Sequence, residues 1–270
     1  MAHPQPTPRG TAIVTGASSG IGKVYAGRLA ARGYDLLLVA RREDRLRHIA
    51  ADLQARFPIK AEVLKADLAQ PAGVASVAER IASQASLALL VNNAGFSSMK
   101  PLAQTPTEVV ESIIALNITA LTVLSKAALV RFQAQDSGAI VNIGSGVGFA
   151  PYPDVPVYGP SKAYVLQFTQ ILQHAVAGTG VRVQLVTPGA VISEGWDVAG
   201  GADLAALPEG IVMSTEDCVD AALRGLDQGE SITAPSLHDE SLLRDYEALS
   251  NTLLQGMFDG KPAARYGVGQ

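Results

Sequence analysis

Three side chains near the middle of the chain could act together on one carbonyl group. Tyr158 and Lys162 lie four residues apart, and Ser145 lies thirteen residues before Tyr158. Because positions four apart share one face of a helix, the Lys162 ammonium can lie beside the Tyr158 phenol. A tyrosine normally titrates near pH ~10, so it serves as an acid or base near neutrality only if a neighbour shifts its pKa. The spacing predicts that Lys162 lowers the pKa of Tyr158, although the pair alone is also compatible with two solvated surface residues.

A glycine-rich segment near the amino terminus predicts a nucleotide site. An apolar run leads into residues 15–22, which contain Gly16, Gly20 and Gly22, and an amphipathic stretch over 24–31 follows. This order is typical of strand, glycine turn and helix, in which the glycines permit a tight turn and a close approach of the backbone to a pyrophosphate. The helix amino terminus presents free N–H groups to the anion. This context favours nucleotide binding over a flexible loop.

Two arginines at the end of the second apolar run indicate which form of the cofactor binds. The run over 34–40 ends in Arg41 and Arg42. In a dinucleotide fold the adenine ribose lies at this strand end, where an acidic residue accepts from a 2′-hydroxyl and an arginine donates to a 2′-phosphate. The sequence therefore favours NADP(H), with Arg41 as the main ligand and Arg42 as its helper. An ordinary solvated arginine pair is the alternative.

Apolar runs and helical stretches alternate along the chain. The expected strands lie near residues 11–15, 34–40, 61–66, 87–91, 138–143 and 181–187. Such alternation predicts an α/β fold: a single doubly wound Rossmann domain with a mostly parallel sheet and helices on both faces. Ligands bind such sheets at the carboxyl ends of the strands. The candidate residues at those ends are Gly16, Arg41, Asp67, Asn93, Ser145 and Pro188.

The complete set of motifs resembles the short-chain dehydrogenase/reductase family. The match runs in order from about residue 11 to about residue 193. It rests on Thr15-Gly16-x-x-x-Gly20-x-Gly22, Asn92-Asn93-Ala94-Gly95, Asn117, Ser145, Tyr158-x-x-x-Lys162 and Pro188-Gly189. The resemblance implies a nicotinamide-dependent oxidoreductase, and it weakens beyond residue 194, in the part that shapes the substrate pocket.

The resemblance also implies individual roles. Ser145 would donate to the substrate carbonyl oxygen, Tyr158 would deliver the proton, and Lys162 would hold the nicotinamide ribose. Asn117 would complete the catalytic group by holding a water chain from Lys162, with a purely structural asparagine as the alternative. Asp67 would contact the adenine or cap a helix. The implied cofactor-binding residues are Gly16, Ser18, Ser19, Gly20, Ile21, Gly22, Arg41, Arg42, Asp67, Leu68, Asn93, Ala94, Gly95, Tyr158, Lys162, Pro188, Gly189, Val191 and Ser193.

Composition excludes several other classes of function. The 270 residues carry a formal charge of −4 with dispersed basic residues, which gives no electrostatic case for nucleic-acid binding. One cysteine suits a reducing compartment, and the four histidines show no metal-ligand spacing. Residues 1–10 lack the apolar core of a signal peptide, and no apolar run approaches the length of a membrane span. We therefore expect a cytoplasmic protein without a metal.

The expected organisation is a flexible arm over 1–10, a dehydrogenase domain over 11–258 and a tail over 259–270. Within the domain, residues 194–211 are expected to form a substrate lid, and helices are expected over 215–225 and 240–258. By resemblance, the long helices near 107–133 and 157–176 imply a homodimer or homotetramer.

The predicted function is hydride transfer between NADP(H) and a carbonyl or secondary alcohol. The lid contains no lysine or arginine, so the substrate is expected to be neutral or amphipathic. Two other functions stay open: an isomerase or dehydratase on the same fold, and a regulator that senses NADP(H) without catalysis.

Overall fold

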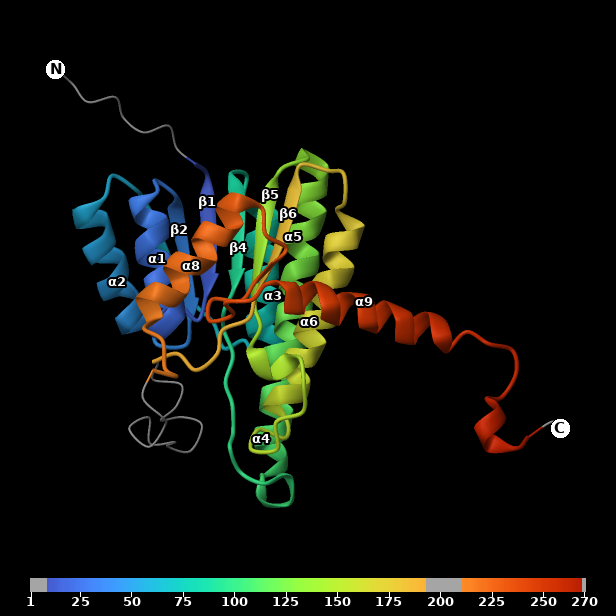
Figure 1. Cartoon of the computed structure of the whole chain (residues 1–270). Helices are drawn as coiled ribbons and strands as arrows, with labels where there is room; N and C mark the ends of the chain where they lie inside the picture. Colours follow the sequence, from blue (N-terminus) through green and yellow to red (C-terminus); the bar gives the residue numbers. More distant parts are fainter. Residues whose placement is uncertain (1–8, 193–209, 269–270) are drawn as a thin grey trace. The chain divides into compact units, whose positions relative to one another are not determined.

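A parallel sheet organises most of the chain, for which a computed structural model describes residues 9–192 and 210–268 (Figure 1). The strands lie in the order β3-β2-β1-β4-β5-β6-β7, and each neighbouring pair is parallel. Their bounds are β1 Thr11–Thr15, β2 Asp35–Ala40, β3 Ala61–Lys65, β4 Leu87–Asn92, β5 Gly138–Ile143, β6 Val181–Val186 and β7 Ile232–Thr233. The order reverses between β1 and β4, and such a reversal opens a crevice at the carboxyl ends of the strands.

Helices cover both faces of this sheet (Figure 1). On one face lie α1 Gly20–Ala31, α2 Glu43–Arg56 and α8 Thr215–Gln228. On the other lie α3 Pro71–Ser83, α5 Leu121–Gln135 and α6 Tyr158–Ala175. The prediction of a doubly wound α/β fold is therefore confirmed.

The strands are apolar throughout because both of their faces are buried. In β1, Ala12 and Val14 pack on the side of α1, whereas Ile13 packs on the side of α3 and α5. All three residues have no exposed surface. Each large apolar side chain buried in this way contributes about 1.5–3 kcal/mol. The six predicted strands are present, and the two-residue β7 at the sheet edge is the strand that periodicity did not indicate.

The long helical run that precedes β5 is interrupted in its middle. Instead of the single helix expected there, α4 Thr107–Ile114 is followed by a π-helical turn over Ala115–Ala120 and then by α5. The π-helical turn contains Asn117, one of the predicted catalytic residues. Such turns are rare and are frequent at functional sites.

By length and composition alone, the run Thr107–Gln135 could cross a membrane, since its mean hydropathy reaches 1.9. Its packing accounts for that apolarity. Leu124, Ala128 and Phe132 of α5 are buried in the core shared with the sheet. One face of the run therefore packs in the core, and 39% of its most apolar stretch is buried.

The C-terminal residues Ser236–Gln270 form a separate unit, whereas the sheet and its helices belong to Met1–Pro235. The unit contains α9 Ser241–Gly256, within the helix expected over 240–258, and a short 3₁₀ turn, Ala264–Tyr266. The sequence had assigned residues 11–258 to one domain, so the observed division falls inside that range. Farther upstream, Ser214 caps α8 by accepting from Asp217 N at 3.0 Å, at the start of the helix expected over 215–225.

Candidate active site

The glycine turn after β1 has a shape that side chains would obstruct. Gly16 has a φ of +67°, and Gly20 has a φ of 51°. A Cβ added to Gly16 would lie 2.7 Å from Asn93 Nδ2, and one added to Gly22 would lie 2.5 Å from the same atom. These glycines therefore let the first turn of α1 lie close against the end of β4.

The amino terminus of α1 is open to an anion. Ser19 is its N-cap residue, and the side chain of Ser19 makes no capping hydrogen bond within this described turn. The N–H groups at the start of α1, from Gly20 through Ile21 and Gly22, therefore lack the acceptor that a cap would supply. Because a helix amino terminus also carries partial positive charge, a phosphate is well accommodated there.

Arg42 lies at the same turn and provides the cation. Its Nη2 donates to Ser18 Oγ at 3.0 Å and to Ser19 Oγ at 2.7 Å. Arg41, which the sequence ranked first, and Arg42 are both exposed, and the hydrogen bonds to the serines of the turn come from Arg42. The residues present thus fit a dinucleotide whose pyrophosphate lies at α1 and whose 2′-phosphate meets Arg42.

Asn93 ties the end of β4 to the glycine turn. Its Nδ2 donates to Thr15 O at 2.9 Å, and the backbone N–H groups of Asn93 and Ala94 both donate to Thr15 Oγ1 at 3.0 Å. Thr15 Oγ1 donates in turn to Val91 O at 3.2 Å. Asn93 therefore pins backbone groups of the glycine turn, and Gly95 continues the loop at the surface.

Asp67 and Leu68 follow β3 at the same edge of the sheet. Asp67 Oδ1 accepts from Ala69 N at 3.1 Å, whereas Gln70 is the N-cap residue of α3. Asp67 therefore closes a short turn, and the alternative that it caps the helix is wrong. Leu68 is buried, and its predicted contact with the adenine stays a prediction.

The hydroxyl groups of Ser145 and Tyr158 meet at the carboxyl end of β5. Ser145 lies two residues after this strand, and Tyr158 is the first residue of α6. Burial raises the pKa of Tyr158 to about 12, although its hydrogen bond with Ser145 acts in the lowering direction. The phenol is therefore protonated near neutral pH, as a proton donor has to be.

Lys162 lies beside this pair, one helical turn after Tyr158. Its Nζ is 5.4 Å from the centroid of the Tyr158 ring and donates to Ile143 O at 2.7 Å. Lys162 is 5% exposed, and burial lowers its pKa to about 8. The pKa of Tyr158 is nevertheless raised rather than lowered in the protein chain alone, because desolvation of the phenol has the largest effect, and the predicted lowering by Lys162 stays a prediction.

Asn117 clamps the loop after β4 with its side chain. Oδ1 accepts from Phe96 N at 3.1 Å, and Nδ2 donates to Phe96 O at 3.1 Å and to Ser161 Oγ at 3.0 Å. Both amide hydrogens are thus engaged, and Asn117 is 1% exposed. These contacts hold the loop in place, while the predicted water chain from Lys162 stays a prediction.

Ser161 is a residue of this site that the sequence analysis missed. It is 1% exposed, and its Oγ donates to Tyr158 O at 2.7 Å while accepting from Asn117 Nδ2. Ser161 therefore links the π-helical turn to the first turn of α6. Its place directly before Lys162 was a usable signal, but a serine at a helix start is ordinarily explained by capping.

Four buried polar residues form a second network beneath the site, and the sequence analysis missed it as well. Asn92 Nδ2 donates to Ser125 Oγ and to Asn142 Oδ1, both at 2.9 Å. Asn142 Nδ2 donates to Thr169 Oγ1 at 3.0 Å. The network joins β4 and β5 to α5 and α6, and so fixes the strand ends that carry the candidate residues.

The segment after β6 closes the site on one side. Pro188 O accepts from Gly146 N at 2.8 Å, which joins this segment to the turn after Ser145. Gly189 is exposed, and Val191 is buried and pairs with Met213 in an isolated bridge. Ser193 and nearly all of the predicted lid over 194–211 lie outside the described residues.

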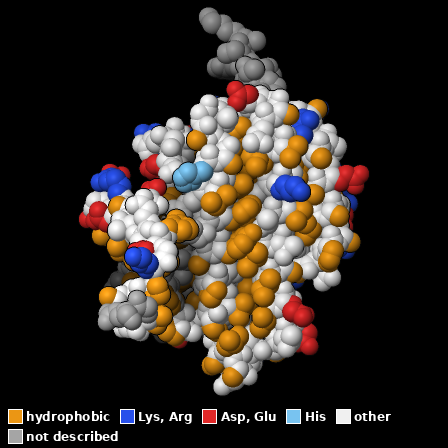
Figure 2. Space-filling model, turned by 90° about the vertical axis from the view of Figure 1, so that its right-hand side faces the viewer, with side chains coloured by type: hydrophobic (Ala, Val, Ile, Leu, Met, Phe, Trp, Pro, Cys, Tyr) orange, Lys and Arg blue, Asp and Glu red, His pale blue; other side chains and the backbone are white. Residues whose placement is uncertain are grey.

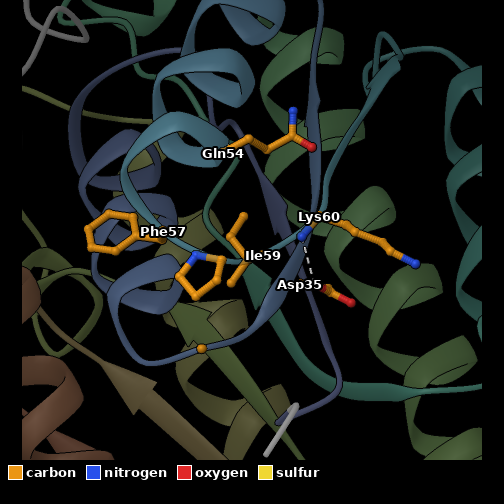
Figure 3. Close-up of a pocket in the computed structure, with 7 residues that line it drawn as sticks. Asp35, Gln54, Phe57, Ile59 and Lys60 are labelled. Carbon is orange, nitrogen blue, oxygen red and sulfur yellow. Dashed lines mark hydrogen bonds between the residues drawn. The ribbon is translucent and has the colours of Figure 1, made fainter. Parts of the chain in front are cut away.

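The surface hollow drawn in Figure 3 is not part of this site. It is lined by Gly33, Asp35, Gln54, Phe57, Pro58, Ile59 and Lys60. These residues lie around the amino ends of β2 and β3, whereas the glycine turn lies at the carboxyl end of β1. Its polar side chains already bond to backbone: Asp35 accepts from Lys60 N at 2.7 Å, and Gln54 accepts from Ala61 N at 3.1 Å.

Comparison with known proteins agrees with this geometry. The sequence model of the short chain dehydrogenases matches residues 10–199. A sulfoacetaldehyde reductase from Chromohalobacter salexigens is 39% identical over 201 residues, which are 72% of this chain and 77% of that protein. A short-chain dehydrogenase from Sphingobium yanoikuyae, solved in complex with NADPH, is 42% identical with a TM-score of 0.91, over 96% of this chain and all of that one. A bulky-bulky ketone specific alcohol dehydrogenase from Comamonas testosteroni is 36% identical with a TM-score of 0.88, over 96% and 99% of the two chains.

This chain combines the doubly wound fold with a glycine turn at the strand reversal and a hydroxyl pair beside a buried lysine. The sequence matches extend over the residues that form these features. This chain belongs to the short-chain dehydrogenase/reductase family of oxidoreductases, which use nicotinamide cofactors.

Proposed function

We propose that this protein is an NADP(H)-dependent reductase of neutral ketones, or a secondary-alcohol dehydrogenase in the reverse direction. The observation that carries the proposal is the protonated Tyr158 hydroxyl, hydrogen-bonded to Ser145 and one helical turn from Lys162, at the sheet edge that carries the glycine turn. A substrate oxygen that gains negative charge here would lie next to a proton donor (Tyr158), a second hydroxyl donor (Ser145) and a cation (Lys162).

The dinucleotide would be held by the glycine turn, the amino terminus of α1 and Arg42, and when bound it would exchange a hydride with the substrate carbon. The chain's own residues do the rest. Ser145 orients the carbonyl oxygen and polarises it, and Tyr158 gives its phenolic proton to that oxygen. Lys162 keeps a positive charge near the phenol below its pKa of about 8 and favours the tyrosinate left after proton transfer.

The preference for NADP(H) is supported by Arg42, which reaches both serines of the glycine turn. A 2′-phosphate brought there would accept charge-assisted hydrogen bonds from a planar guanidinium. The NADPH-bound relative at 42% identity points the same way.

The substrate class is inferred from the charge around Ser145 and Tyr158. Residues 145–161 contain one charged side chain, Asp154, and no cation to pair with a sulfonate or carboxylate. The described apolar residues near these positions in sequence include Phe149 and Tyr152, and Tyr152 is 52% exposed. We therefore favour a bulky neutral ketone over the small anionic aldehyde of the sulfoacetaldehyde reductase.

The test replaces the proposed proton donor. Tyr158→Phe keeps the ring and removes the hydroxyl, so NADPH affinity is expected to stay near wild type while ketone reduction falls by about 100-fold to 10,000-fold. The matched control is Tyr164→Phe on the same helix, whose hydroxyl meets Thr122 at 2.9 Å and which is expected to keep full activity. NADPH oxidation with a panel of bulky aryl ketones and with sulfoacetaldehyde supplies the readout. Near-normal turnover by Tyr158→Phe would refute the role of this tyrosine.

We also propose that the protein forms a homo-oligomer through α5 and α6 and acts in the cytoplasm. Apolar side chains gather in a broad band on the side where these helices lie (Figure 2). Exposed apolar residues there are Val123, Val130, Tyr164 and Ile171. A band of this kind is typical of a surface that a partner covers.

A further inference from the structure

The turn around Ser145 contains three glycines at alternate positions, and packing requires two of them. A Cβ added to Gly144 would lie 3.0 Å from Leu185 Cδ1, and one added to Gly148 would lie 2.8 Å from Lys162 O. Both glycines are buried. A side chain at either position would therefore press on β6 or on α6.

Gly146, the middle glycine, has no such reason to be a glycine. It is exposed and does not have a positive φ, so a residue with a side chain could adopt its backbone conformation. Among the described residues, a Cβ added to Gly146 would meet only Pro188 O, at an ordinary contact distance of 3.7 Å. A side chain here would also restrict the unfolded chain and so stabilise the fold. Neither the backbone nor the packing of the described chain therefore accounts for this glycine.

The open side of Gly146 lies next to the Ser145 hydroxyl. Ser145 Oγ donates to Pro188 O at 3.5 Å, and the Cβ added to Gly146 would lie 3.7 Å from the same oxygen. Gly146 N also donates to Pro188 O, at 2.8 Å, which fixes the turn in this position. The hydroxyl and the open side of Gly146 are thus neighbours around one backbone oxygen.

In the proposed function the Ser145 hydroxyl binds the carbonyl oxygen of a ketone, whose two substituents extend from the carbon next to that oxygen. A substituent directed toward Gly146 would meet backbone instead of a side chain. Residues 144–153 contain no charged side chain to pair with an ionised group, so an aryl or alkyl group fits best there. We propose that Gly146 leaves the room for one of two large substituents and so lets this protein accept ketones that are bulky on both sides. This inference rests on the proposed function and adds a specificity-determining residue to it.

The experiment fills the space beside Ser145 in steps. Gly146→Ala and Gly146→Val are compared with wild type, and Gly27→Val in α1 is the matched control, because a Cβ at Gly27 would meet nothing within 4 Å. The two substrates share a phenyl ring: acetophenone has a methyl group as its second substituent, and valerophenone has a butyl group. NADPH oxidation gives kcat/KM for each ketone, and fluorescence titration gives the Kd for NADPH.

Gly146→Val should lower kcat/KM for valerophenone by about 10-fold to 200-fold and that for acetophenone by less than about threefold, since a narrower pocket discriminates between substrates by size. Gly146→Ala should give an intermediate ratio of the two values, and Gly27→Val should match wild type. The Kd for NADPH should stay at the wild-type value in every variant. An equal loss with both ketones, or weaker NADPH binding by Gly146→Val, would overturn the inference.

The same measurements distinguish failure of this inference from failure of the proposed function. A wild-type protein that binds NADPH and reduces neither ketone would reject the proposed function, and the inference with it. Reduction of both ketones with the same ratio of kcat/KM in wild type and Gly146→Val would reject the role of Gly146 alone.

Discussion

Arg42 is the residue that we expect to decide between NADPH and NADH. Arg42 reaches Ser18 and Ser19 with one nitrogen, at 3.0 Å and 2.7 Å, and is therefore already positioned at the turn. The sequence placed two arginines after β2 and ranked Arg41 first, whereas the hydrogen bonds to the turn come from Arg42. That difference depends on the backbone at the start of α2, where Arg42 is the N-cap residue.

Arg42→Ala is expected to weaken NADPH binding by about 30-fold, since a hydrogen bond to a charged group contributes about 2 kcal/mol. NADH binding should change little, because NADH has no 2′-phosphate. Arg41→Ala is the matched control and should have the smaller effect on NADPH. Nicotinamide fluorescence titrations give all four dissociation constants, and equal losses for NADPH and NADH would contradict the assignment of Arg42.

Ser161 positions Tyr158 through a backbone carbonyl, and its role can be separated from simple stability. Ser161→Ala removes the donor to Tyr158 O and one acceptor for Asn117, so kcat should fall by about tenfold as α6 shifts its first turn. Ser125→Ala is the matched control, because Ser125 is also buried and accepts from an asparagine amide. Both variants should lose about 1–3 kcal/mol of unfolding free energy.

Only Ser161→Ala should lose kcat at saturating substrate with the Kd for NADPH unchanged. Steady-state kinetics and thermal unfolding of the two variants test this difference. A Ser125→Ala variant with the same loss of kcat would show that the effect is general destabilisation.

At the scale of elements, apolar runs predicted the strands well because β1, β2, β4, β5 and β6 are buried on both faces. Two features could not be predicted in this way. The strand β7 has two residues, too few to produce a period, and the π-helical turn around Asn117 differs from an α-helix by a single added residue. The hydrogen bonds that Asn117 makes with Phe96 and Ser161 are contacts between distant segments, which a local pattern does not contain.

The start of α1 provides a test with two glycines of the same helix. A Cβ at Gly22 would lie 2.5 Å from both Asn93 Nδ2 and Gly16 O, whereas a Cβ at Gly27 would meet nothing within 4 Å. Gly22→Ala should therefore move the turn away from β4 and abolish measurable NADPH binding. Gly27→Ala should leave binding intact and raise stability by about 0.5–1 kcal/mol through helix propensity. Normal NADPH affinity of Gly22→Ala would show that the close approach is not required.

At the scale of the whole molecule, the site reduces the stability of the fold that carries it. Lys162 is buried with a pKa of about 8, below its ordinary value of 10.5. Between these pH values the unfolded chain holds a proton that the folded chain has released, so the free energy of unfolding rises with pH. Tyr158 has the opposite effect: the free energy of unfolding falls as the pH rises above 10, because the folded pKa is about 12 and the phenol of the unfolded chain ionises first.

At pH 7, Lys162→Met should therefore unfold at a higher temperature than wild type. Its free energy of unfolding should rise by about 3 kcal/mol, less the contribution of the lost hydrogen bond to Ile143 O. The rise in stability between pH 8 and 10.5 should disappear in this variant. Lys126→Met, at an exposed position of α5, should keep that rise. Denaturant unfolding at several pH values measures both effects, and an unchanged slope in Lys162→Met would contradict the buried-lysine account.

Transfer of an isotope label from NADPH to a ketone shows whether this chain moves a hydride between the two. The purified protein is incubated with NADPH carrying deuterium on the transferred position of the nicotinamide and with a panel of bulky neutral ketones, and the alcohols are analysed by mass spectrometry. The account predicts an alcohol with one deuterium on the carbinol carbon, formed by wild type and lost in Tyr158→Phe. Tight NADPH binding without a deuterated alcohol from any ketone would contradict it and would favour a regulator that senses the dinucleotide.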